Sequence, residues 1–529
     1  MADSLDPKAE HHLDEPPTSR AWLLAKNAIA NIVRAFSSSA VTVILPVFLV
    51  IVLQPRLYAA WALAFSLGAF VVYLDLGVPT TVQAMVGRAM GLSDLRSAQR
   101  VTLSGLKVSA AVVSACLLVA LVAALAFGLI FPAVPRAIWG SAGVALLIIV
   151  GGQGSSLIGN TISAFFAGQQ RSFVPTAVLA PARIISMVAA LIAAALTENL
   201  VWAAVGYALP LVFGMLALLA KFRAEWTETT DEPQAGRGVL EPFEVTALLK
   251  YSGPLVIWGV STLVSTGAGL VLVARFDYAH VVPFSIAAIV VSALAGLESS
   301  ATAPFLPELA RTHELHGRSR VTLHAERLSR VNGGVLFLAV GALLALAPWF
   351  LPVLARHAEL RVSWPILVVL LIGNAIHLSG TPISLAFIAT KTHTKVILPP
   401  VIEAATGLIA SVGLGLLFGA LGVAIGVLVG GCVGIILCFS WSIRLSGVLT
   451  ISTWQILSRS TIWPSLSIAP VVIAVSLVIA NGMEGTATGV VIAAVSFLVC
   501  FASLWLLSRD DGRSFIRRGL SEGALSSEV

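Results

Sequence analysis

The sequence has 529 residues, of which 58% are hydrophobic and only 11% are charged, whereas a soluble globular protein has about 25% charged residues. The formal net charge is +6, but the basic residues lie in short loops between long apolar blocks, so the charge does not indicate a nucleic-acid partner. All four cysteines lie within apolar runs, without a CxxC pair or a Cys/His cluster. The composition therefore predicts a polytopic membrane protein, with no metal site and no cofactor.

The predicted elements begin after a polar, acidic N-terminal stretch, residues 1–25, which we interpret as a disordered cytoplasmic tail. The apolar blocks that follow have about 18–30 residues, enough to cross a hydrocarbon core of roughly 30 Å. All should be α-helical, because lipid leaves the edges of an open sheet unsatisfied. About 14 spans are expected, at 30–54, 59–86, 105–131, 138–167, 175–196, 200–221, 251–274, 281–303, 331–351, 365–389, 396–418, 420–443, 462–480 and 486–507.

An internal repeat organises these spans. A shift of 220 residues places Tyr58 on Tyr278, and it also places Gly206 on Gly426. The repeat predicts two pseudo-symmetric six-helix bundles, related by an axis along the membrane normal because six is an even number. The expected divisions are an N-lobe (26–222, spans 1–6), a cytoplasmic linker (223–244), a C-lobe (245–445, spans 7–12), two extra C-terminal spans (446–508) and a cytoplasmic tail (509–529).

The distribution of basic residues predicts the orientation. With the N-terminus in the cytoplasm, 26 of the 32 Lys and Arg residues fall in inner segments, and Arg183 falls within a span. The outer segments hold the remaining five, which are Arg56, Arg136, Arg275, Arg356 and Arg361. Cytoplasmic loops carry an excess of Lys and Arg. This asymmetry favours an even number of spans, with both termini cytoplasmic.

Arg183 and Glu403 are candidate cavity residues. The 220-residue shift relates the two, so a cation and an anion are expected at equivalent depths in the two lobes. A charge at membrane depth costs at least about 2.5 kcal/mol and usually faces a cavity or a partner. The hypothesis is that both line a polar cavity between the lobes, or form a pair that breaks during transport. The alternative is that each reaches the cytoplasmic interface.

Two further cations lie near the cytoplasmic mouth of such a cavity. Arg34 lies at the start of the first span, and Lys250 lies at the start of the seventh, one helical turn from the aligned position. Together they would suit a phosphate headgroup. The alternative is ordinary positive-inside placement of basic side chains.

Three titratable residues are candidates for coupling or gating. Asp75 precedes Gly77 and Pro79, so its carboxylate could instead cap backbone amides freed by a break in the helix. Glu298 lies in the eighth span about one turn from the position aligned with Asp75. His377 could titrate near neutral pH, or could be a hydrogen-bonded core histidine.

Several segments resemble the bacterial polysaccharide flippases. Segment 57–68 (LYAAWALAFSLG), followed by 74–79 (LDLGVP), is similar to that family's second span, although Ala59 stands where the family has glycine. Segment 167–171 (AGQQR) resembles its Gly-x-x-Arg cytoplasmic turn. Segment 418–424 (FGALGVA) resembles its turn before span twelve. The resemblance covers about residues 26–445.

The family belongs to the multidrug/oligosaccharidyl-lipid/polysaccharide (MOP) exporter superfamily. The resemblance implies two six-helix bundles, alternating access, a bacterial plasma-membrane location and an undecaprenyl-diphosphate-linked oligosaccharide as substrate. Only Arg34, Asp75 and Arg171 match the family by position. No Walker A motif occurs, so an ion gradient of H⁺ or Na⁺ is the expected energy source.

Three alternatives stay open at this point. A multidrug/cation antiporter of the same fold would use the acidic residues Asp75, Glu298 and Glu403. A lipid II flippase would also have fourteen spans, but this chain lacks the arginine-rich first span of that family. A membrane polysaccharide polymerase would be an enzyme, and it would need a sizeable outer loop, whereas the largest expected outer loop, 352–364, is short.

Overall fold

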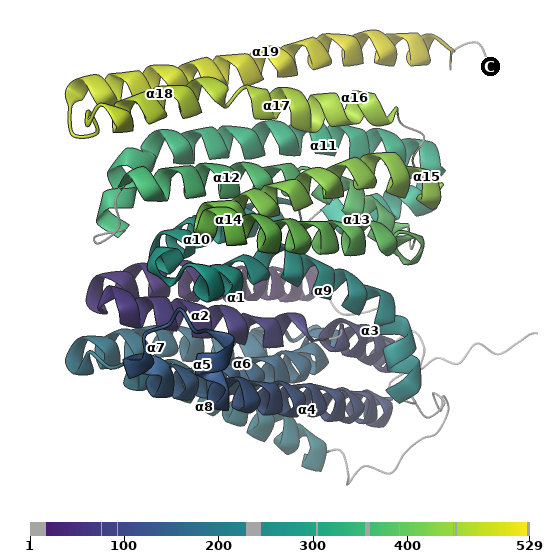
Figure 1. Cartoon of the computed structure of the whole chain (residues 1–529). Helices are drawn as coiled ribbons and strands as arrows, with labels where there is room; N and C mark the ends of the chain where they lie inside the picture. Colours follow the sequence, from purple (N-terminus) through teal and green to yellow (C-terminus); the bar gives the residue numbers. More distant parts are fainter. Residues whose placement is uncertain are drawn as a thin grey trace, which may run out of the picture.

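The computed structural model describes residues 17–525, except 76, 92–93, 229–244, 303–304, 355–359, 391, 448 and 450–451. The described chain is helical throughout (Figure 1). In its first half the elements are α1 (Pro17–Val52), α2 (Pro55–Tyr73), α3 (Val78–Gly91), α4 (Leu95–Leu125), α5 (Phe127–Ile130), η2 (Arg136–Ile138), α6 (Trp139–Gly168), α7 (Phe173–Thr197) and α8 (Leu200–Glu228). In its second half they are α9 (Val245–Phe276), η3 (Tyr278–His280), α10 (Val281–Thr302), α11 (Phe305–Leu354), α12 (Leu360–Leu378), α13 (Thr381–Ala389), η4 (His393–Lys395), α14 (Leu398–Leu437), η5 (Cys438–Ser442), α15 (Ile443–Ser446), α16 (Thr453–Leu457), η6 (Ser458–Ile462), α17 (Trp463–Leu466), α18 (Ala469–Ala480) and α19 (Ala487–Leu525).

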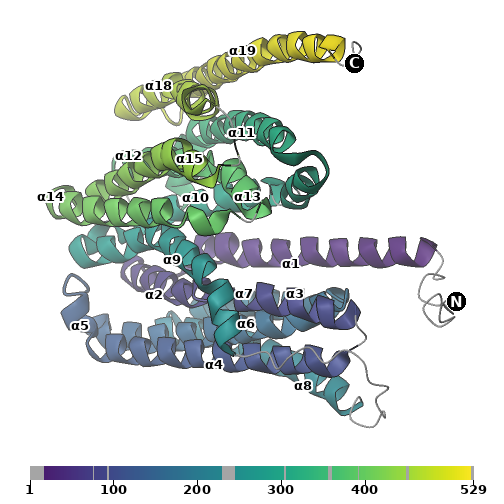
Figure 2. The same cartoon turned by 90° about the vertical axis from the view of Figure 1, so that its right-hand side faces the viewer.

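The helices form two stacked bundles, and α18 and α19 lie along the outside of the second one (Figures 1 and 2). In the N-terminal bundle α1 packs on α7, α2 on α6, and α6 on α8. In the C-terminal bundle α9 packs on α14, α10 on α12, and α12 on α14. The order of packing partners is therefore the same in both bundles, as a duplicated unit requires.

The contacts between the two bundles are also consistent with a duplicated unit. Helix α1 contacts α10, α9 contacts α2, and α2 contacts α10. If α1 corresponds to α9 and α2 to α10, the first two contacts exchange with each other and the third maps onto itself. Such self-complementary pairing is the property of a two-fold interface. The arrangement supports the pseudo-symmetry that the repeat predicts.

Among the described residues, ten helices are long and apolar enough to cross a membrane, or eleven if the bent pair in α9 is one span. The predicted count of 14 is therefore not confirmed. Part of the difference is that the apolar parts of α1 and α2 are short. Helix α4 shows the surface expected of a lipid-facing helix, because Leu118, Val119 and Val122 are all more than half exposed.

The two predicted spans 396–418 and 420–443 correspond to one folded-back element. Gly419 has a positive φ of 58° inside α14, so the two halves of this helix run against each other. A Cβ on Gly426 would lie 2.3 Å from Cα of Ser411. Its repeat partner Gly206 would likewise touch the backbone of Ala189 on the preceding helix. Small residues let membrane helices approach this closely, so the repeat preserves a packing requirement.

Some boundaries differ from the sequence prediction. Helix α1 begins at Pro17, so residues 17–25 of the expected disordered tail are helical. Proline is favoured in the first turn of a helix, where its missing N–H is not needed. Helix α19 continues to Leu525, so the expected C-terminal tail is helical over most of its length. Of the expected linker, residues 223–228 belong to α8, and the rest lies outside the described residues.

A glycine substitution tests the fold of α14. We expect Gly419→Ala to lower the melting temperature of the purified protein and its folded yield, because a Cβ there would lie 2.3 Å from Asp277 Oδ2 and the positive φ disfavours a side chain by about 1–2 kcal/mol. The control is Gly413→Ala in the same helix, where a Cβ meets nothing within 4 Å. The control should be neutral or slightly stabilising. Equal melting temperatures for the two variants would contradict the hairpin geometry.

Candidate functional site

Two half-buried cations meet inside the N-terminal bundle. Arg34 of α1 and Arg183 of α7 are close enough for their like charges to interact. The Tyr207 ring of α8 also lies within electrostatic range of Arg183. Within the described residues, neither arginine forms an ion pair with a carboxylate. We call this group the basic site, and no carboxylate of the described side chains compensates its charge.

The surrounding helices hold Tyr207 in one place. Its ring meets Trp61 edge-on with centroids 6.0 Å apart, and meets Phe65 at 5.5 Å. Both partners lie on α2, one helical turn apart, and they stack on each other. Gln153 of α6 interacts with the Tyr207 hydroxyl. Aromatic pairs in this geometry fix ring orientation, so Tyr207 presents its hydroxyl to the basic site as part of a packed core.

The chemistry of the basic site suits an anion. A half-buried cation that lacks a counter-charge is costly to retain in a membrane-embedded bundle. A phosphate or diphosphate group could accept charge-assisted hydrogen bonds from both guanidinium groups, and Arg is well shaped for such bidentate contacts. The third predicted cation, Lys250, has its backbone in α9, but its side chain lies outside the described residues.

A second cluster lies inside the C-terminal bundle. His377 Nδ1 of α12 is 2.5 Å from Glu403 Oε1 of α14. Glu298 of α10 is near enough to interact with His377, and it lies beside Thr381 and Asn332. One carboxyl oxygen of Glu298 is buried without a hydrogen-bond partner among the described residues. We call the three titratable residues, His377, Glu403 and Glu298, the acidic site.

Two spaces adjoin the acidic site. A cavity of about 240 Å³ is lined by His377, Glu403, Ser265, Ser384 and Cys438. A smaller space of about 20 Å³ lies between α9, α12 and α14, and it also reaches His377 and Glu403. The small one is large enough for one water molecule. The imidazole–carboxylate pair therefore adjoins space through which a proton or a hydrated cation could reach it.

Glycines make room for this pair. A Cβ on Gly434 would lie within 2.2 Å of Glu403 Oε2, so the carboxylate occupies space that only a glycine leaves free. Helix α12 ends at Leu378, and α13 starts at Thr381 beyond Gly380. His377 therefore lies in the last turn of α12, directly beside the break between the two helices.

The remaining predicted residue, Asp75, belongs to neither cluster. Its Oδ1 accepts a hydrogen bond of 2.9 Å from the Gly77 amide, at the break between α2 and α3. Gly77 has a φ of +66°, a conformation for which glycine is suited. This contact supports the capping alternative for Asp75. A coupling role for Asp75 stays a prediction.

Arg183 and Glu403 do not pair in this structure. Each lies in its own bundle, and Glu403 is bonded to His377, so a cavity lined by both charges stays a prediction. Sequence reasoning missed Tyr207 as a partner of Arg183, because a tyrosine in an apolar span gives no pattern of its own. The sequence identified four of these residues as separate candidates. It did not show that Arg34 lies near Arg183, or that His377 bonds to Glu403.

No family model matches the chain, and no curated protein matches it. Several solved structures do match the chain. The lipid II flippase MurJ, in an inward closed conformation, has a TM-score of 0.64 at 13% identity, covering 92% of this chain and 100% of that chain. An inward-facing multidrug resistance MATE family transporter of the MOP superfamily has a TM-score of 0.57 at 17% identity. The match covers 78% of this chain and 95% of that chain.

A MOP superfamily transporter from Pyrococcus furiosus, described as having a binding pocket of reverse polarity, has a TM-score of 0.55 at 17% identity. It covers 80% of this chain and 96% of that chain. At these identities the likeness concerns the fold. The chain is a multi-pass helical membrane protein with the fold of MOP superfamily transporters.

Proposed function

We propose that this protein is an alternating-access transporter that flips an anionic, lipid-linked substrate across a bacterial plasma membrane. The substrate class is an undecaprenyl-diphosphate-linked oligosaccharide. The observation that carries the proposal is the basic site, in which Arg34 and Arg183 lie together without a carboxylate partner among the described residues. A diphosphate would supply the missing counter-charge, while the polyprenyl chain stays in lipid.

The acidic site supplies the proposed coupling to an ion gradient. His377, Glu403 and Glu298 lie within one bundle, and the 240 Å³ cavity is lined by His377 and Glu403. Imidazole is the side chain whose charge most readily changes between about pH 5 and 8. Protonation of the His377–Glu403 pair would change the net charge of this bundle without requiring ATP. The basic site thus binds substrate in one lobe, and the acidic site binds H⁺ in the other, with both termini in the cytoplasm.

Two related functions have specific support. The likeness to MurJ, a lipid II flippase, favours a peptidoglycan precursor as the lipid-linked substrate. The likeness to MATE transporters, together with the carboxylates of the acidic site, favours an antiporter for cationic drugs. The basic site separates the first possibility from the second, because a cationic drug gains nothing from two arginines.

Transport by the purified full-length protein in proteoliposomes tests the proposal. The probe is a fluorescent polyprenyl-diphosphate-linked N-acetylglucosamine, and the readout is the fraction of probe bleached by a membrane-impermeant reductant. We expect flipping above the rate in protein-free vesicles, and inhibition by excess farnesyl diphosphate. Ethidium efflux in the same vesicles, without flipping of the probe, would instead identify an antiporter.

A further inference from the structure

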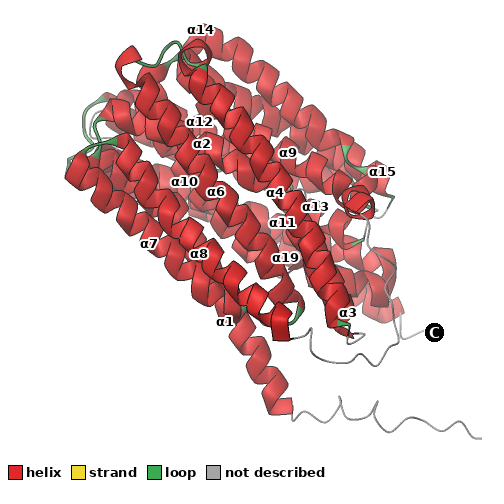
Figure 3. Ribbon diagram, turned by 90° about the horizontal axis from the view of Figure 1, so that it is seen from below, coloured by secondary structure: helices red, strands yellow, loops and turns green. Residues whose placement is uncertain are grey.

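Two hydrogen bonds join the bundles at the face opposite the N-terminal end of α1, which we call the distal face. Figure 3 shows the N-terminal part of α1 extending beyond the bundles at the bottom of the view. The distal face contains the α1–α2 turn, η3 and the turn at Gly419, which hydrogen bonds bring together. The Tyr278 hydroxyl donates to the Arg56 carbonyl at 2.7 Å. The hydroxyl groups of Ser285 and Tyr58 are 3.3 Å apart. Ser285 also donates to the Val282 carbonyl within α10 at 2.8 Å, so its oxygen is free to accept from the Tyr58 hydroxyl. In each bond a tyrosine of one bundle contacts the other bundle.

The two tyrosines are repeat partners. Tyr278 follows Tyr58 by 220 residues, the interval that relates the two lobes. Tyr58 lies in the first turn of α2, and Tyr278 lies in η3 immediately before α10. Tyr58 is fully buried, and Tyr278 is only 9% exposed. Both rings therefore fill the same reciprocal interface from opposite sides, as related positions across a pseudo-two-fold axis do.

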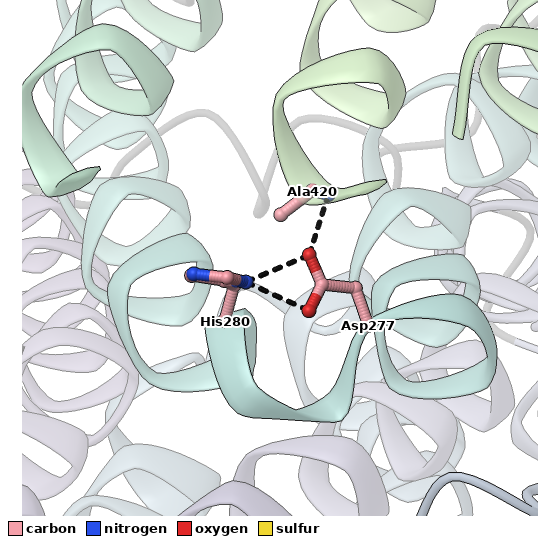
Figure 4. A network of polar contacts seen from close by, with 3 residues as sticks. All are labelled: Asp277, His280 and Ala420. Carbon is pink, nitrogen blue, oxygen red and sulfur yellow. Dashed lines mark hydrogen bonds and ion pairs between the residues drawn. The ribbon is translucent and has the colours of Figure 1, made fainter. Parts of the chain in front are cut away.

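A rigid network holds Tyr278 in place (Figure 4). The carboxylate of Asp277 accepts a hydrogen bond of 3.1 Å from the Ala420 amide, at the first residue of the returning half of α14. The same carboxylate lies 2.7 Å from His280 Nδ1. The short helix η3 that carries Tyr278 is thus tied to α14, so Tyr278 moves with the C-terminal bundle.

Tyr58 is tied to the basic site in the same manner. Trp61 lies one turn further along α2, and its ring packs on Tyr207, which adjoins Arg183. A movement of α7 or α8 around a bound anion would therefore be transmitted through packed rings to the turn that carries Tyr58. Packed interfaces of this kind switch between discrete arrangements rather than deforming smoothly.

We propose that Tyr58 and Tyr278 form a two-part latch that closes the substrate path at the distal face. The inference rests on the alternating-access part of the proposed function. A neutral hydrogen bond contributes little net stability, so each half of the latch can break in every cycle. The Asp277–His280–Ala420 network and the α2 aromatic stack present the two halves. Opening the distal face requires both tyrosines to leave the opposite bundle.

Cysteine labelling tests the latch without a substrate. The reporter is Ser66→Cys on α2, about 12 Å deeper than Tyr58 by helical rise, where Ser66 faces Gly267 of the other bundle. The parent has its four native cysteines replaced, and it must retain the wild-type melting temperature. A membrane-impermeant maleimide is added to intact cells and to inside-out vesicles. Arg136→Cys, at an exposed site on the distal face, marks which preparation presents that face.

We expect Tyr278→Phe and Ser285→Ala each to raise the labelling rate of the reporter from the distal side about two- to tenfold, the effect of one neutral hydrogen bond. The combined variant should show roughly the product of the two effects. Tyr278→Phe keeps the ring and therefore the packing. The controls are Trp139→Phe, which removes a bond to Val134 within one bundle, and Ser300→Ala, an exposed serine that bonds only within α10.

Three outcomes are distinguishable. Faster labelling in the latch variants but not in the controls supports the latch. Unchanged labelling in the combined variant at equal membrane abundance overturns it, even if flipping of the lipid-linked probe is observed. Equal acceleration in the controls also overturns it, because that result would reflect general loosening of the distal face. Failure of the flipping assay alone would count against the proposed substrate and not against the latch.

Discussion

Arg183→Ala should reduce flipping of the polyprenyl-diphosphate-linked probe at least about 30-fold, while the protein remains folded and membrane-inserted. The structure places Arg183 beside Arg34, with no carboxylate partner among the described residues, so the substitution removes like-charge repulsion and breaks no ion pair of the protein. The melting temperature should therefore stay the same or rise. Loss of one buried charge-assisted contact to the diphosphate costs about 2 kcal/mol or more, and about 2 kcal/mol corresponds to a factor of about 30 in rate.

Flipping is expected to fall while the melting temperature stays the same or rises, and this combination makes the experiment specific. A residue with a packing role would lose stability and transport together. Arg183→Lys keeps the charge but not the planar fork, so partial activity would indicate a simple charge requirement and inactivity would indicate bidentate binding. The control is Arg136→Ala, an exposed arginine over the Trp139 ring. Wild-type flipping by Arg183→Ala at equal abundance would remove Arg183 from the proposed substrate site.

Glu403→Gln should leave binding of farnesyl diphosphate within about twofold of wild type, but should flatten the response of transport to pH between about 5 and 8, the range in which an imidazole such as His377 titrates. The amide has the shape of the carboxylate and can still hydrogen-bond to His377, so the local packing is kept. It cannot gain or lose a proton. The other titratable groups near the pair are Glu298 and Cys438, on α10 and η5. These groups stay in the variant.

A second variant shows whether the pair acts as a unit. His377→Gln should flatten the pH response as Glu403→Gln does, and the double variant should be no worse than either one, because residues in contact are not additive. Alanine is unsuitable at His377, since it would leave a buried carboxylate unpaired at a cost of about 3–5 kcal/mol. The control is Glu225→Gln, which loses a partly exposed ion pair to Arg171. A wild-type pH profile in Glu403→Gln would end the coupling proposal.

Several features of this protein could be read from local sequence. The apolar blocks predicted an all-helical membrane fold, because lipid requires each segment to satisfy its own backbone hydrogen bonds. The break between spans 396–418 and 420–443 was predicted at Gly419, where the structure has a positive φ. A capped break at Asp75 and Gly77 was one of the two roles that the sequence left open for Asp75, and the Gly77 amide bonds to the Asp75 carboxylate. Each of these depends on neighbours within a few residues along the chain.

The count of spans and the grouping of the charged residues could not be obtained in this way. The apolar parts of α1 and α2 are short, so the number of membrane-length helices among the described residues differs from the number of apolar blocks. A helix that is apolar on all sides has no polar face, so its sequence does not show which side faces the other helices and which faces lipid. The sequence therefore named Arg183 and Glu403 as related positions without showing their partners.

By itself the sequence determined an all-helical membrane protein, and it predicted an internal duplication, a cytoplasmic placement of most basic residues and a few charges at membrane depth. The tertiary structure alone decided that Arg183 lies with Arg34 and Tyr207, that Glu403 lies with His377 and Glu298, and that Tyr58 and Tyr278 contact opposite bundles. The reason is physical. Composition and hydrogen bonding fix each helix locally, whereas the rotation of each helix about its axis and the docking of the bundles depend on small-residue contacts, such as Gly426 on Ser411, between segments far apart in the chain.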